Sequence, residues 1–194
     1  MKAPLATLRG GIKRTRMLLE QLLALARAQE PAQAQGVSIS THQIFRQVVE
    51  DLLPLAVAKS IDIGVVSDTD VWLPVLEIDL KTIVKNLVEN AIRYTPHSGQ
   101  VDLSVQKTAK NIVLKIQDNG PGIPKTERER VFDPFYRVIG NDEVGSGLGL
   151  SIVKTIADRL GATVTLNDCN GSVHSRGLLV TVIFPISISE SQDS

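Results

Sequence analysis

Near its middle the chain reads Asn86-Leu87-Val88-Glu89-Asn90-Ala91-Ile92-Arg93-Tyr94-Thr95-Pro96. This stretch ends a longer pattern, over residues 76–94, whose apolar positions recur with the spacing of a buried helix face. The neighbouring face of the predicted helix collects polar side chains, because residues three and four apart lie side by side. These are Asn86, Glu89, Asn90 and Arg93. Taken alone, such a group is more often an ordinary helix surface than a binding site.

Two glycine-rich segments further along the chain are also candidates for a binding site. The first, Asp118-Asn119-Gly120-Pro121-Gly122, follows a predicted strand at 112–116 and places a carboxylate at the strand end. A plain turn is the commoner interpretation of this segment by itself. The second, Gly145-Ser146-Gly147-Leu148-Gly149-Leu150, precedes a predicted helix whose first N–H groups could face a phosphate. It matches neither the dinucleotide-binding fingerprint nor a P-loop, which disfavours an ordinary nucleotide-binding α/β fold.

The composition bounds the function classes. Hydrophobic residues make up 43% and charged residues 22% of 194 residues, as in an ordinary globular protein. Lys and Arg total 21 and Asp and Glu total 21, so no net charge favours a nucleic-acid partner, and we expect none. The single cysteine, Cys169, cannot form an internal disulfide, which favours a cytoplasmic location. No apolar stretch has the roughly 20 residues of a membrane helix, so we expect any membrane connection to lie outside this chain.

The chain divides at a polar stretch. Apolar residues from Leu8 to Ala26 are spaced four and three apart, a heptad seam that predicts one long N-terminal helix. Pro31 and Gly36 then lie in a Gln- and Ala-rich segment typical of a linker. We predict four parts, namely half of a helical hairpin (1–29), a linker (30–36), a second domain (37–186) and a polar tail (187–194).

The second domain has the pattern of an α/β fold. Apolar runs and alternation predict strands at 37–39, 61–66, 101–105, 112–116, 162–166 and 178–184. Helices are predicted after Ser40, over 76–94 and over 150–160. Ser40 and Gln43 have the spacing of a capping box at the start of the first of these helices. Neighbouring strand pairs without a regular strand–helix repeat predict a two-layer α/β sandwich.

In order, the asparagine stretch, Asp118 to Gly122, Phe132-Asp133-Pro134-Phe135-Tyr136-Arg137 and Gly145 to Leu150 resemble the ATP-binding catalytic domain of bacterial sensor histidine kinases. These belong to the Bergerat-fold (GHKL) ATPase superfamily. The resemblance covers 37–186, and residues 5–29 look like the second helix of the dimerisation hairpin that precedes this domain. It implies a mixed sheet covered by three helices, with residues 123–144 as a lid over the nucleotide.

The resemblance also implies ATP and Mg²⁺ as cofactors and assigns residues to them. Asn90 would ligate Mg²⁺, and Glu89 is either a general base or a solvated helix carboxylate. Asp118 would accept a hydrogen bond from the adenine amino group and so select adenine over guanine. The other positions expected around the nucleotide are Asn86, Arg93, Tyr94, Gly120, Gly122, Ile123, Phe135, Arg137, Gly145, Gly147, Leu148, Gly149, Leu150 and Thr181.

Members of the resembled family transfer the γ-phosphoryl group of ATP to a histidine in a segment reading His-Glu/Asp-x-x-x-Pro, and then to the receiver domain of a response regulator. This sequence has no such segment, because His42, His97 and His174 lack the acidic neighbour. We therefore expect a protein-histidine kinase domain with weak or absent autophosphorylation. The resemblance implies a homodimer through the helical hairpin, and a cytoplasmic domain of an inner-membrane protein.

Two other interpretations stay open. A topoisomerase, mismatch-repair or chaperone ATPase would share the asparagine helix and the Asp118 segment, but the Phe132 to Arg137 segment argues against it. A non-enzymatic module with a degenerate nucleotide pocket is the second. The intact Asn90, Asp118 and lid glycines weigh against degeneracy.

Overall fold

The computed structural model describes Ala26 and residues 38–138, 146–169 and 177–186. Ala26 is helical, but the rest of the predicted N-terminal helix, the linker, the polar tail and Gly145 lie outside the described residues. Among the helices within these ranges, none combines the length and the apolar character that crossing a bilayer requires.

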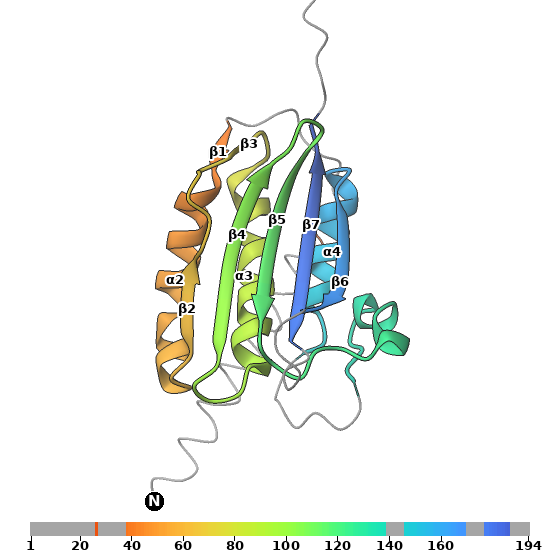
Figure 1. The fold of residues 1–194 in the computed structure, drawn as a ribbon. Coiled ribbons are helices and arrows are strands. Elements are labelled where there is room, and N and C mark those ends of the chain that lie inside the picture. The colour runs from red at the N-terminus through yellow and green to blue at the C-terminus, as the bar shows by residue number, and fades with distance from the viewer. Residues whose placement is uncertain (1–25, 27–37, 139–145, 170–176, 187–194) are drawn as a thin grey trace, which may run out of the picture.

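A five-stranded mixed sheet forms one layer of the molecule (Figure 1). Its strand order is β2-β4-β5-β7-β6. Strand β2 runs parallel to β4, and the remaining neighbours are antiparallel. A separate antiparallel pair joins β1 to β3. The strands are β1 (Ile39–Ser40), β2 (Asp62–Val65), β3 (Trp72–Leu73), β4 (Gln100–Lys107), β5 (Asn111–Asp118), β6 (Thr163–Asp168) and β7 (Leu178–Pro185).

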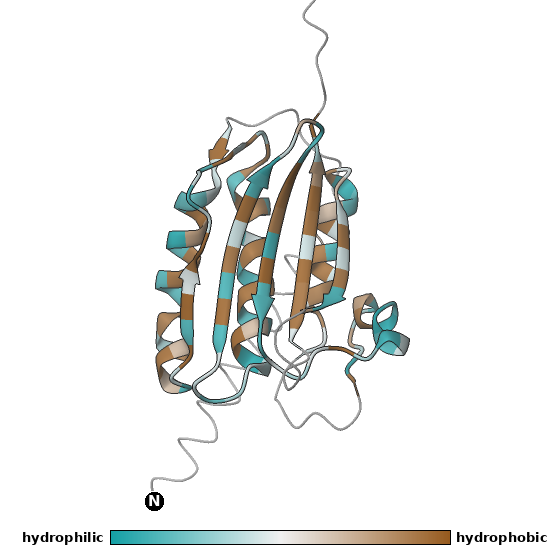
Figure 2. Ribbon diagram, viewed as in Figure 1, coloured by the Kyte–Doolittle hydropathy of each residue, from teal (hydrophilic) through white to brown (hydrophobic). Residues whose placement is uncertain are grey.

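Three helices cover one face of this sheet (Figure 1). They are α2 (Thr41–Ala58), α3 (Glu77–Tyr94) and α4 (Gly149–Arg159). Hydropathy alternates along the strands (Figure 2), and in β4 the buried Val101, Leu103 and Val105 alternate with the more exposed Asp102 and Ser104. One face of each strand therefore packs on the helices while the other stays open. The predicted two-layer α/β sandwich is confirmed.

Helix α2 begins where its sequence signal predicts. The Ser40 hydroxyl accepts a hydrogen bond from the Gln43 backbone N–H at 3.0 Å, which satisfies one of the orphan donors of the first turn. Ser40 in turn donates to Asp70 at 2.6 Å, and the His42 backbone N–H donates to the same carboxylate at 3.0 Å. Although burial acts in the opposite direction, these hydrogen bonds hold the pKa of Asp70 below its ordinary value. The cap ties the start of α2 to the segment ahead of β3.

Three short elements have no counterpart in the predicted ones. They are β3 and two 3₁₀ turns, η1 (Lys125–Glu127) and η2 (Arg130–Phe132). Elements of two or three residues span at most about one period of a hydrophobic pattern, so no repeat in the sequence can reveal them. Both 3₁₀ turns lie in the stretch expected to form the lid.

Candidate functional site

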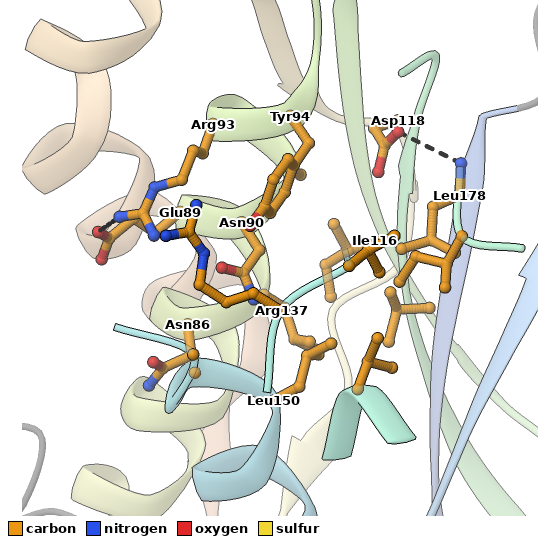
Figure 3. Close-up of a pocket in the computed structure, with 18 of the residues that line it drawn as sticks. Asn86, Glu89, Asn90, Arg93, Tyr94, Ile116, Asp118, Arg137, Leu150 and Leu178 are labelled. Carbon is orange, nitrogen blue, oxygen red and sulfur yellow. Dashed lines mark hydrogen bonds and ion pairs between the residues drawn. The ribbon is translucent and has the colours of Figure 1, made fainter. Parts of the chain in front are cut away.

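A cleft opens between α3, the adjoining ends of β5 and β7, the segment after η2 and the start of α4 (Figure 3). Segments far apart in sequence meet there because β5 and β7 are neighbours in the sheet and α4 packs on α3. The lining residues are Asn86, Leu87, Glu89, Asn90, Ala91, Arg93, Tyr94, Ile116, Asp118, Gly122, Ile123, Val131, Tyr136, Arg137, Val138, Ser146, Gly147, Gly149, Leu150, Leu178 and Val180.

A buried carboxylate closes one end of the cleft. Asp118 is 6% exposed, and its Oδ1 accepts hydrogen bonds from the backbone N–H groups of Gly120 at 2.9 Å and Leu178 at 3.2 Å. Burial raises the pKa of Asp118, because it disfavours the charged form, and the two backbone donors partly oppose this effect. Its Oδ2 makes no hydrogen bond to any residue that the structure describes. The free oxygen is an acceptor available to a ligand.

Two asparagine amides of α3 face the first residue of α4. A Cβ on Gly149 would come within 3.2 Å of Asn90 Nδ2 and 3.3 Å of Asn86 Oδ1. Glycine therefore lets the start of α4 approach both amides more closely than another residue would. Asn86 Nδ2 donates to the Thr82 carbonyl at 2.9 Å, whereas the Asn90 amide has no partner within the described ranges. Asn90 thus presents an uncommitted polar group to the cleft.

Charged side chains gather at this asparagine end, away from Asp118 (Figure 3). Glu89 and Arg93, one helical turn apart on α3, form an ion pair at 2.6 Å, with each side chain 21% exposed. Arg137 reaches toward the same region from the segment after η2. Guanidinium groups present planar sets of donors that match phosphate or carboxylate oxygens. The asparagine end can therefore receive an anion.

The middle of the cleft is apolar. Ile116 of β5, Leu178 of β7 and Leu150 of α4 lie between the two polar ends, with Tyr94 above them (Figure 3). A pocket with an apolar wall and a few polar groups at defined points is the usual form of a small-molecule site. This arrangement suits a flat, weakly polar ring at the Asp118 end, with an anionic tail extending toward Asn90.

The aromatic segment after η2 is joined to the glycine segment before α4. The backbone N–H of Phe135 donates to the Gly147 carbonyl at 2.9 Å. Gly147 has φ +73°, and a Cβ there would come within 2.6 Å of the Phe135 carbonyl carbon. Only glycine adopts this conformation at so close a contact without strain. The two predicted lid segments therefore form one wall of the cleft.

Tyr136, which lines the cleft, is held from its far side. Its hydroxyl hydrogen-bonds to Glu127 of η1, and the Arg130 guanidinium lies 4.3 Å from the centre of its ring. The hydrogen bond to Glu127 raises the pKa of Tyr136. The two 3₁₀ turns thus fix the orientation of one cleft side chain.

Arg128, between the two turns, fastens the same region to the sheet. Its guanidinium donates to the carbonyls of Ile123 at 3.0 Å and Leu166 at 3.3 Å, and it pairs with Asp168. Ile123 lines the cleft, whereas Leu166 and Asp168 belong to β6. The floor of the cleft near Ile123 is therefore tied to the edge strand.

Most of the predicted site residues meet in this cleft, and four of those described do not line it. Gly120 lies outside the lining, although its N–H donates to Asp118. Phe135 is 63% exposed, and Leu148 is fully buried in the core. Thr181 follows Val180, which lines the cleft, so its side chain lies on the opposite face of β7. Those that line it are Asn86, Glu89, Asn90, Arg93, Tyr94, Asp118, Gly122, Ile123, Arg137, Gly147, Gly149 and Leu150.

Most of the apolar lining is not predicted from the sequence, although Ile123 and Leu150 are among the predicted residues. Ile116, Leu178 and Val180 belong to strands whose alternation is that of any core strand, so no pattern separates a cleft wall from a core position. Tyr136 had a signal, because it stands in the quoted Phe132 to Arg137 segment. The predicted residues include its neighbour Phe135 and not Tyr136.

The chain is similar in sequence to a known family and to proteins within it. Residues 75–188 match the family described as "Histidine kinase-, DNA gyrase B-, and HSP90-like ATPase". The chain is 36% identical over 178 residues to the sensor protein kinase PmrB of Pseudomonas aeruginosa, covering 90% of this chain and 36% of that protein. It is 34% identical over 168 residues to the sensor protein QseC of Escherichia coli K12, covering 84% and 36%. The chain thus spans about a third of the length of these relatives.

A solved structure agrees with these relatives. The mycobacterial sensor histidine kinase MprB superposes with a TM-score of 0.67 at 26% identity, covering 77% of this chain and 96% of that one. Both relatives are sensor kinases, which favours that branch over a topoisomerase, mismatch-repair or chaperone ATPase. The matched residues contain the Asn86 to Pro96 stretch, the Asp118 segment and the start of α4. The chain belongs to the histidine kinase-, DNA gyrase B- and HSP90-like ATPase family and contains the catalytic domain of a two-component sensor histidine kinase.

Proposed function

We propose that the cleft binds Mg-ATP, with adenine at the Asp118 end and the phosphates at the asparagine end. The proposal rests on the distribution of polar and apolar groups along the cleft. A buried carboxylate, whose Oδ2 has no hydrogen bond to a described residue, lies at one end. The Asn90 amide, which has no partner within the described ranges, lies at the other end beside the guanidinium groups of Arg93 and Arg137, and an apolar wall separates the two ends. A charged acceptor suits the exocyclic amino group of adenine, whereas guanine presents a carbonyl at that position.

The residues present fit a magnesium ion held jointly with phosphates. Within the described ranges, no group of three or more His, Cys, Asp or Glu side chains could hold a metal by itself. Mg²⁺ commonly uses one or two protein oxygens and completes its shell with water and substrate phosphates. Asn90, whose amide has no hydrogen-bond partner among the described residues, would supply such an oxygen beside Gly149. The ion would neutralise charge that develops on the phosphates during transfer.

The chain's own groups would hold and orient the phosphates. The first N–H groups of α4 have no side-chain cap, so they remain available to an anion. Arg137 and Arg93 would add charge at the same end. The ion pair with Arg93 favours Glu89 as an orienting partner of that guanidinium over a general base. These roles are positioning and charge stabilisation, which dominate catalysis of phosphoryl transfer.

We also propose that the chain donates the γ-phosphoryl group of ATP to a histidine on a dimerisation hairpin, from which a response regulator receives it. The names of the sensor-kinase relatives support the reaction class. The histidine kinase ThkA, solved in complex with the response regulator TrrA, shares the fold, with a TM-score of 0.73 at 20% identity, covering 95% of this chain and 51% of that one. We propose residues 5–29 as the second hairpin helix and the homodimer contact of the intact, membrane-bound protein.

Phosphoryl transfer in trans tests this function. The chain is mixed with radiolabelled Mg-ATP and a separately produced histidine-bearing hairpin from a sensor histidine kinase. We expect label on the hairpin, none on a hairpin whose histidine is replaced by glutamine, and much less with Asn90→Ala. If the chain binds ATP but labels no hairpin, the transfer role fails. Acid-labile label on the chain alone would contradict the absence of an acceptor within it.

A further inference from the structure

An ion pair far from the cleft joins the two helices that form its asparagine end. Arg159 Nη2 of α4 lies 2.5 Å from Asp79 Oδ1 of α3, across 80 residues of sequence. The side chains are only 13% and 10% exposed. Arg159 Nε is buried and has no hydrogen-bond partner in the described part of the chain. The pair is therefore largely desolvated and incompletely satisfied.

The pair lies at one end of an antiparallel helix contact whose other end is the cleft. Arg159 is the last residue of α4 and meets Asp79 in the first turn of α3. Gly149 is the first residue of α4 and meets Asn86 and Asn90 in the second half of α3. Ten residues separate Gly149 from Arg159, a helical rise of about 15 Å. Eleven residues separate Asp79 from Asn90, a rise of about 16 Å. The segments of α4 and α3 that separate the ion pair from the asparagine contact are thus of similar length.

Between these ends the helices meet through apolar side chains. Leu80, Ile83 and Leu87 of α3 and Ile152 and Ile156 of α4 belong to the core. The hydrophobic effect is non-directional and roughly proportional to buried area, so by itself it does not select one register. A hydrogen-bonded ion pair has a defined geometry. Buried ion pairs often add little net stability because desolvation offsets their attraction, and fixing register is their best-attested role.

We propose that the Asp79–Arg159 pair sets the register of α4 along α3 and thereby positions the start of α4 against Asn86 and Asn90. Both are positioning residues, because neither lines the cleft. A shift of α4 along its axis would move Gly149 and the free N–H groups away from the two amides. The inference rests on the proposed binding of ATP phosphates at this end.

If the ion pair sets this register, its loss should affect the binding of a phosphate-bearing ligand and not that of a nucleoside. The start of α4 lies at the phosphate end, whereas Asp118 and its backbone donors belong to β5, the following turn and β7. Loss of the pair should therefore weaken binding of Mg-ATP and leave binding of adenosine unchanged. A pair that served stability alone would affect both ligands alike, in proportion to the loss of folded protein.

The double variant Asp79→Leu/Arg159→Met replaces both charged side chains with apolar ones, so no buried charge is left unpaired. Its control is Lys154→Gln/Asp158→Asn, which removes an exposed ion pair from the same helix. The affinity for Mg-ATP is measured by calorimetry, that for adenosine by NMR titration, and the free energy of unfolding by denaturant titration. Arg159→Lys, which keeps the charge but loses the planar fork, serves as a milder variant if the double variant does not fold.

We expect the double variant to bind Mg-ATP about fivefold more weakly, within the range for residues that act on a site without touching its ligand. Adenosine affinity and the free energy of unfolding should not fall, and the control should match the native chain. Arg159→Lys should give a smaller loss, also for Mg-ATP alone. Equal weakening of both ligands, or unchanged Mg-ATP affinity, would overturn the inference. Failure of the native chain to bind Mg-ATP would instead defeat the proposed function.

Discussion

The backbone N–H of Leu178 donates a hydrogen bond at 3.2 Å to the carboxylate of Asp118, sixty residues earlier in the chain. The bond joins the end of β5 to the start of β7, which are neighbours in the sheet. Together with the Gly120 N–H it orients Oδ1, and Oδ2 has no hydrogen bond to a described residue. The proposed base-recognition end is therefore a product of the sheet and not of a single loop.

Asp118→Asn should weaken ATP binding roughly tenfold or more, because a hydrogen bond to a charged acceptor contributes about 1.5 to 3 kcal/mol. Calorimetric titration with Mg-ATP measures the change. Asp102→Asn is the matched control, since Asp102 lies on the neighbouring strand and on the open face of the sheet. Unchanged affinity in Asp118→Asn, or an equal loss in the control, would count against the assignment.

Adenosine binding should depend on the ionisation of Asp118. Burial raises the pKa of this carboxyl above its ordinary value of 3.8, and the ionised form is the better acceptor. Affinity should thus be constant near neutral pH and fall as pH drops through the raised pKa, earlier than for an exposed aspartate. Adenosine is used because it carries no phosphate that titrates in this range. NMR titrations at several pH values measure the profile, and Asp118→Asn should flatten it.

Gly177→Ala should disrupt the Asp118 end. A Cβ at Gly177 would lie 2.2 Å from the Asp118 carbonyl oxygen, so the start of β7 must move. We expect a lower free energy of unfolding and loss of adenosine binding, measured by denaturant and NMR titration. Gly64→Ala is the control, because a Cβ there meets nothing within 4 Å. A Gly177→Ala chain that binds adenosine normally would contradict the proposed placement of the base.

Asn90→Ala should remove the effect of magnesium on ATP affinity. The native chain is expected to bind ATP more tightly with Mg²⁺ than with a chelator, because Asn90 offers an oxygen to the ion. The variant should show the same, weaker affinity in both conditions. Asn111→Ala, at the opposite end of β5 from Asp118, provides the control. A magnesium effect that persists in Asn90→Ala would exclude this residue as a ligand.

Ser40→Ala should lower the free energy of unfolding by about 1 kcal/mol, the usual cost of losing a helix N-cap. Denaturant titration measures it, with Ser104→Ala on the open face of β4 as a control expected to stay near the native value. Nucleotide affinity should not change, because the cap lies outside the cleft lining. An Ser40→Ala chain as stable as the native one would show that Asp70 alone secures the start of α2.

The main elements of the fold could be predicted from local patterns. Helix α3 begins within one residue of its predicted start, and α2 begins at the predicted Ser40 cap. Helix α3 has an apolar face as its signal, and α2 has both an apolar face and a capping side chain. The pairing of β2 with β4 has no such signal, because it depends on how the whole sheet closes.

The polar part of the cleft could also be predicted, since Asn90, Asp118 and Gly149 stand in recognisable segments. The face of a strand or loop on which each side chain lies could not be predicted from the sequence. Thr181 and Val180 are adjacent in sequence, yet only Val180 lines the cleft, because the register of β7 decides which face each residue takes. Phe135 and Tyr136 differ likewise, and a positive φ at Phe135 turns the chain there.

Discrimination between ATP and GTP distinguishes base recognition at Asp118 from a cleft that binds phosphates alone. Both nucleotides are titrated in Mg²⁺ into the native chain by calorimetry, so that the phosphates are identical and only the base differs. Base recognition by Asp118 predicts saturable ATP binding and GTP binding weaker by roughly tenfold or more, because guanine leaves the buried Asp118 without its donor. Absence of ATP binding at millimolar concentration, or equal affinity for the two nucleotides, would contradict it.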